Sequence, residues 1–154
     1  MITQITFLIE AAPMFNKFLL KFQAEGPMIR ILFAELKEVL LQLLRRFVKP
    51  EEVNNITGAN LQKFNLDTVD ILLPLEKCYA GPRTEEALKN LPVYDAKIER
   101  EKMQKHYIEI SKYFQKMFPL NSQMLRDLSC LHTDIYMKTA TVHSIEVLRN
   151  VFHI

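Results

Sequence analysis

Apolar residues recur at helical spacing in the first stretch of the chain, from Phe7 to Phe22. They occupy positions 7, 8, 11, 14, 15, 18, 19 and 22, a pattern that lines one face of a helix. Pro13 lies inside this pattern. Because proline lacks a backbone N–H and clashes with the preceding turn, we expect the helix either to begin near Pro13 or to kink there.

Residues 28–48 continue the helical spacing with a wider apolar stripe. Ile31, Val39 and Leu41 broaden it enough to indicate burial on more than one side. The short Glu-Gly-Pro break at residues 25–27 predicts that this helix and the preceding one form an antiparallel hairpin. Because few other helices are available to cover helix 28–48, we also expect the unit to expose an apolar patch.

Residues 49–82 differ in character from the segments on either side. Asn-Asn at 54–55, Thr-Gly at 57–58 and Pro74 interrupt short apolar pieces such as residues 71–73. This pattern is typical of a loop-rich connector with a helical turn or a brief extended stretch.

A short helix and a long one are predicted after the connector. Thr84 is expected to cap the short helix, with Glu85 and Glu86 in the first turn, where the helix dipole favours acids. Residues 94–118 form the long helix, which should lie on the surface because its apolar stripe is narrow. That stripe consists of Met103, Tyr107, Ile110, Phe114 and Met117.

Two more helices are predicted beyond Pro119, which ends the long one. Asn121 is expected to cap the first of them, with Leu120 and Leu125 in the positions of a hydrophobic staple. Its expected buried face is Met124, Leu125 and Leu128. The last helix covers about residues 138–151, with a stripe of Val142, Ile145, Leu148 and Phe152.

These segments together predict an all-α fold. The expected architecture is an irregular bundle of about five to six helices with a loop-rich connector at 49–82, forming a single helical domain or domain fragment over residues 1–154. Only 3 glycines are present, which argues against hairpin turns and against glycine-rich nucleotide loops.

Net charge and cysteine content limit the cellular compartment and the kinds of binding partner that we expect. The net charge of +2 creates no global field that would drive binding to nucleic acid or anionic lipid. The 2 cysteines are too few for a secreted disulfide framework, so we expect reduced thiols inside a cell. No charge-free stretch of about 18 residues is present, which argues against a membrane partner.

Candidate chemical groups are sparse. Cys130, His132 and His143 carry side chains that can bind zinc, but structural zinc sites usually show two closely spaced ligand pairs. The same residues could form a Cys-His nucleophile pair, but no orienting acid can be identified beside them. Asp67 and Asp70 are the only acids with an arguable claim to a catalytic metal, and acids in such loops more often terminate turns. We expect no enzyme activity, no metal and no cofactor.

The long helix offers the only candidate nucleic-acid contacts. Its basic side chains that could touch a DNA backbone are Lys97, Arg100, Lys105, Lys112 and Lys116. Acids interleave with them, which is typical of a solvated, salt-bridged face, and the local excess of positive charge supports at most weak, non-specific DNA binding. Residues 45–46 (Arg-Arg) and Lys49 form a second basic cluster, which favourable interaction with the end of helix 28–48 explains without a ligand.

Four segments carry a family resemblance: PMIRILFAELKEVLLQLLRRFVKPE, LLPLEKCYAG, TEEALKNL and FPLNSQMLRDLSCL. They resemble the helical part of hAT-transposase-like proteins, a transposon-derived group that often carries a BED-type zinc finger. The resemblance covers roughly residues 13–152. It implies an all-α insertion from a ribonuclease-H-like core, whereas the core's three metal-binding carboxylates, the zinc finger and the dimerisation region match nothing in this chain.

Two functional hypotheses follow. In the first, the chain is a non-catalytic helical module or remnant of a transposase-like protein that packs against other protein, such as the missing remainder of the core, or touches DNA backbone. In the second, it is a free-standing adaptor that binds a partner helix in an exposed apolar groove. The resemblance favours the nucleus over the cytoplasm.

Overall fold

The computed structural model describes residues 2–23, 29–54 and 56–129. Over these residues the fold is all-α, as predicted, and the only strand-type pairing among them is one isolated bridge between Val48 and Leu72. The elements are α1 (Ile2–Gln23), α2 (Ile29–Leu44), α3 (Pro50–Asn54), α4 (Gly58–Leu61), the 3-10 turns η1 (Val69–Ile71) and η2 (Leu75–Lys77), α5 (Pro82–Lys89), α6 (Val93–Met117) and α7 (Gln123–Leu128). The predicted helix at 138–151 lies outside the described residues.

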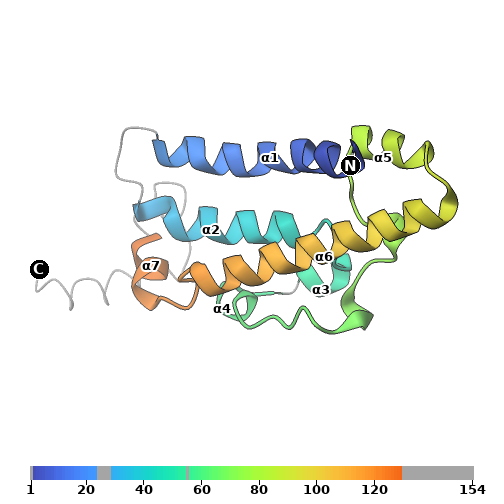
Figure 1. Ribbon diagram of the computed structural model, residues 1–154. Coiled ribbons are helices and arrows are strands. Elements are labelled where there is room, and N and C mark those ends of the chain that lie inside the picture. The colour runs from blue at the N-terminus through green and yellow to red at the C-terminus, as the bar shows by residue number, and fades with distance from the viewer. Residues whose placement is uncertain (1, 24–28, 55, 130–154) are drawn as a thin grey trace, which may run out of the picture.

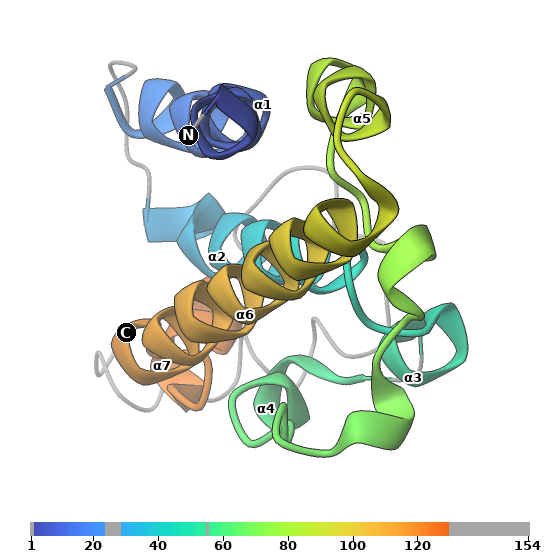
Figure 2. The ribbon, with the colours of Figure 1, turned by 45° about the vertical axis from the view of Figure 1, so that its right-hand side comes forward.

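The long helices lie roughly side by side. α1 and α2 run in opposite directions, as the predicted hairpin requires, and α6 runs antiparallel to α2 (Figure 1). In the turned view α6 crosses the middle of the molecule, with α1 and α5 above it and the connector helices α3 and α4 below it (Figure 2). The connector therefore covers the side of α6 that α1 and α5 leave open.

α1 continues without interruption through Pro13, so the prediction that the helix begins there is wrong. The proline ring is exposed, whereas Phe7 and Met14 are buried in the core on either side of it. Packing of both halves holds the helix together, and the backbone hydrogen bond lost at Pro13 would have joined Ile9, on the solvent side.

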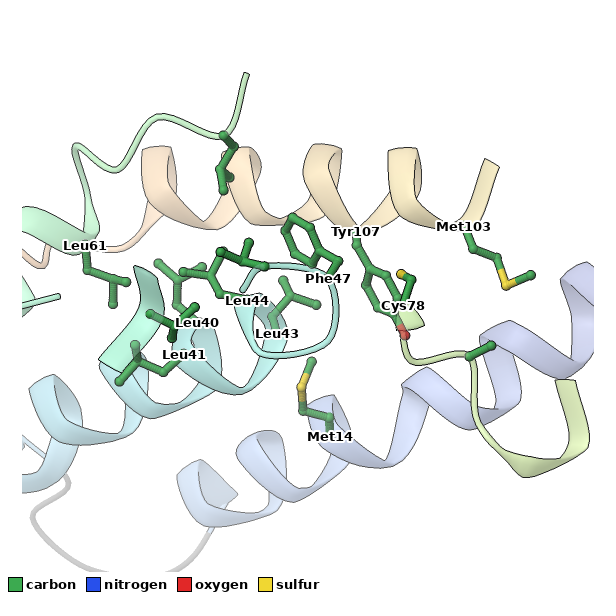
Figure 3. Close-up of a cluster of buried hydrophobic side chains, with 14 of the residues drawn as sticks. Met14, Leu40, Leu41, Leu43, Leu44, Phe47, Leu61, Cys78, Met103 and Tyr107 are labelled. Atoms are coloured by element: carbon green, nitrogen blue, oxygen red, sulfur yellow. The ribbon is translucent and has the colours of Figure 1, made fainter. Parts of the chain in front are cut away.

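Tyr107 of α6 lies at the centre of the core and is 1% exposed. Its ring stacks against Phe47 with centroids 5.8 Å apart and meets Phe7 of α1 edge-on at 5.0 Å. Figure 3 shows Tyr107 and Phe47 beside the α2 leucines Leu43 and Leu44, both fully buried. The broad apolar stripe predicted for helix 28–48 is confirmed, since Val39 and Leu41 are buried together with Leu40, Leu43 and Leu44.

α6 differs in part from its predicted stripe. Met103 and Tyr107 are buried and Phe114 is half-buried, but Met117 is 56% exposed. Gln115 is buried instead, because its amide donates hydrogen bonds to the carbonyl oxygens of Leu61 and Phe64 at 3.0 and 2.9 Å. The apolar pattern could not show this polar contact with the connector.

The two predicted N-caps are both shifted. Thr84 is fully buried inside α5, which begins with Gly81 as its cap residue and Pro82 at its first position. Ser122, not Asn121, caps α7, and its hydroxyl accepts the Leu125 N–H at 3.4 Å.

The register of α7 moves with its cap. Leu120 is fully buried and Leu128 is 7% exposed, but Met124, predicted to be buried, is 54% exposed. The predicted staple between Leu120 and Leu125 is out of register by one residue, because Ser122 rather than Asn121 starts the helix.

Gly81 is the point where α1 touches the start of α5. Its φ of 90° lies in a region that L side chains rarely adopt, and a Cβ atom placed there would lie 2.7 Å from Cβ of Glu10. Glu10 in turn accepts the Arg83 N–H at 3.2 Å through Oε1. An acid from the first helix thus satisfies a free donor at the start of α5.

Gly81→Ala should lower the free energy of unfolding by about 1–3 kcal/mol, because it combines backbone strain with a collision against Glu10. Gly58→Ala is the matched control, since its Cβ would meet only the end of the Phe33 ring, at 2.7 Å, without a positive φ. Chemical denaturation of both variants measures the difference. Equal losses would show that the backbone at Gly81 is not strained.

Candidate interaction surfaces

The five basic residues predicted to contact DNA do not form one surface. Arg100 donates two hydrogen bonds to Glu85 of α5, at 3.1 and 2.5 Å, and its side chain is only 17% exposed. Lys112 pairs with Asp67 of the connector at 2.6 Å, and this hydrogen bond raises the pKa of the lysine. Both cations therefore join α6 to neighbouring elements.

The remaining three, Lys97, Lys105 and Lys116, are exposed. At about 100° per residue, Lys105 and Lys116 point in nearly the same direction, whereas Lys97 lies roughly 80° away from Lys105. Glu101 and Glu109, four residues before and after Lys105, flank it on the same face. This face is mixed in sign, which supports the solvated interpretation over a DNA-binding stripe.

Within the part of the chain that the structure describes, no group of three or more His, Cys, Asp or Glu side chains lies close enough together to hold a metal ion. Asp67 pairs with Lys112, and Asp70 lies exposed in η1, where its backbone carbonyl accepts a hydrogen bond from Lys49 at 2.5 Å. The candidate zinc ligands Cys130, His132 and His143 lie outside the described residues.

Cys78 is buried in the core, where it is 4% exposed. Removal from water raises the pKa of its thiol to about 11, against a smaller opposing effect of the Arg100 charge. Because thiols react as thiolates, this cysteine is chemically inert in the folded protein near neutral pH.

α1 exposes more large apolar side chains than any other helix in the described ranges, and they lie on its outer face. We define this face by Ile2, Ile5, Leu8, Ile9, Leu19 and Leu20, which are 49–73% exposed. These positions follow one side of the helix, Asn16 lies among them, and no charged residue interrupts them. α1 runs along the upper edge of the molecule, away from the connector (Figure 1). The apolar patch that we expected the unit to expose therefore lies mainly on α1.

A hollow of about 480 Å³ opens on the other flank of α1, beside the end of α2. Lys17, Arg45, Arg46 and Tyr79 line it, and we call this site the basic hollow. The sequence identified the Arg45-Arg46 pair as a basic cluster, but it did not show that Lys17 lies beside the pair, because Lys17 comes from a different helix. Only the antiparallel packing of α1 and α2 brings the three cations together.

No helix in the described ranges combines the length and the apolar character needed to cross a membrane. Comparison of the chain with protein-family models, with curated proteins and with solved structures finds no match.

Ionisation of Cys78 should make the protein less stable at high pH. The unfolded thiol loses its proton near pH 9 while the folded thiol keeps it to about 11, so the free energy of unfolding falls as the pH rises between these values. We would compare Cys130→Ser with Cys78→Ala/Cys130→Ser by denaturation from pH 8 to 11. The single variant should lose more stability than the double variant, and parallel curves would contradict the burial effect.

Duplex DNA should bind the chain no more tightly than micromolar at physiological salt, and binding should weaken steeply as salt is added. Fluorescence anisotropy at two salt concentrations measures this. Lys105→Gln/Lys116→Gln should weaken the low-salt binding further, because these are the exposed α6 lysines that share a face. Submicromolar binding that survives physiological salt would reveal a recognition surface on this helix.

Proposed function

We propose that the chain is a non-catalytic helical module that docks onto other protein through the outer face of α1. The single observation that carries this proposal is the run of exposed, uncharged apolar side chains along that helix. Covering each of these half-exposed side chains contributes about 1 kcal/mol, so a partner that covers several of them gains useful affinity.

The occupant we propose is the remainder of a transposase-like protein of the hAT group, in the nucleus. The four sequence segments that resemble this group support the proposal, and an all-α unit with an uncovered apolar helix is what an insertion that packs against a larger core would require. In this setting the module positions other parts of the protein and leaves strand chemistry to carboxylates elsewhere.

A free-standing adaptor is the alternative. A second hollow of about 610 Å³, lined by Pro13, Asn16, Lys17, Leu20 and Lys21, favours it, because its exposed lining is mostly apolar in spite of the two lysines and can receive a side chain from a partner helix. The two functions use the same face of α1 and differ in whether the partner belongs to the same protein.

The outer face of α1 should make the isolated chain bind a hydrophobic dye and self-associate as its concentration rises. Ile5→Gln/Leu8→Gln/Ile9→Gln should weaken both effects while circular dichroism stays unchanged, because these three side chains are 49–62% exposed and do not belong to the core cluster.

The matched control replaces three exposed apolar residues of α6, as Val93→Gln/Tyr94→Gln/Met117→Gln. It should behave like the parent chain in dye fluorescence and in sedimentation velocity over a concentration series. A compact parent chain that stays monomeric and binds no dye would refute the proposed docking face.

A further inference from the structure

The basic hollow holds more positive charge than its surroundings neutralise. Three cations line it, and none of the described lining residues is acidic. Glu38 reaches Arg45 at 3.3 Å, but both side chains are 49% exposed, so this pair is weak. Neither Lys17 nor Arg46 forms an ion pair with a carboxylate in the described ranges.

The end of α2 removes only part of this excess. A helix C-terminus acts as roughly −0.5 of an elementary charge. Three cations less Glu38 and this partial charge leave about +1.5 in the hollow. Interaction with the α2 dipole accounts for the two arginines at that helix end, but it does not account for Lys17, which comes from the middle of α1.

Arg46 is held in place before any ligand arrives. Its guanidinium carbon lies 5.0 Å from the ring centroid of Tyr79 and 5.8 Å from that of Tyr107, and Nη1 donates to the Tyr107 hydroxyl at 3.1 Å. The same hydroxyl donates to the Tyr79 carbonyl at 3.0 Å, and the Tyr79 N–H donates to the Arg46 carbonyl at 2.8 Å. Little conformational entropy remains to be lost when the guanidinium binds an anion.

We propose that the basic hollow binds a phosphoryl group. An excess above one charge suits a phosphate dianion better than a single carboxylate, and arginine and lysine supply the fork and the point charge that phosphate oxygens accept. This site contains none of the six residues that define the outer face of α1, and it does not depend on the function proposed for that face.

The lining of the hollow indicates where the phosphoryl group comes from. The hollow is largely open to solvent, and Pro13 and Met14 form an apolar part of its wall. A phosphate ester can place its organic part there, whereas free phosphate would leave that wall uncovered. The two sources are distinguished by comparing phenyl phosphate with inorganic phosphate.

The test is a titration of the full chain with each compound at low salt, followed by NMR of the backbone amides. The amides of Lys17, Arg46 and Tyr79 should shift in a saturable way, with phenyl phosphate binding more tightly if an ester is the ligand. Equal affinities would assign the site to the phosphate group alone. No saturable shift up to about 10 mM would overturn the proposal.

Two double variants of equal charge make the test specific to this site. Lys17→Gln/Arg45→Gln should weaken binding at least ~10-fold, because it removes two exposed cations that line the hollow. Lys105→Gln/Lys116→Gln removes the same charge from α6 and should leave the affinity within about twofold. Equal weakening by both would show a general charge effect and would contradict a phosphoryl site in the hollow.

Discussion

The burial of Tyr107 is the constraint on which the rest of the structure depends. Its ring contacts Phe7 and Phe47, and its hydroxyl joins Arg46 to the Tyr79 carbonyl. One side chain thereby connects α1, the end of α2, the connector and α6. Because burial of a hydroxyl is costly unless it is hydrogen-bonded, this position fixes the backbone of the connector as well as the packing of the helices.

Polar side chains on α6 hold the connector in addition to apolar packing. Gln104 donates to the Leu73 carbonyl at 2.9 Å, and Gln115 reaches two carbonyl oxygens near α4. A segment with little regular structure leaves many backbone acceptors unpaired, and these amides satisfy several of them. Of the charges that resemble a ligand-binding stripe, Lys112 serves the same purpose through Asp67, whereas Arg100 joins α6 to α5 through Glu85.

The outer face and the basic hollow lie on different sides of α1 and have different chemistry. Its outer face is apolar and uncharged, which suits a protein partner, whereas its inner flank contributes Lys17 to the basic hollow. α1 is thus shared by three environments, since Phe7 and Met14 belong to the core. The outer face of α1 carries no charged residue. An exposed apolar face of this kind is typical of a surface that another protein covers.

The sequence by itself determined the all-α class, five of the seven α-helices of the described ranges to within a few residues at most ends, and the mixed charge of α6, because these depend on local spacing. Tertiary structure decided the rest. Glu10 binds the start of α5, so Thr84 is no cap, and flanking core contacts carry α1 through Pro13. The basic hollow forms only because packing brings Lys17 of α1 to the end of α2. Nothing in the local sequence pattern of either helix predicts that these residues lie close together.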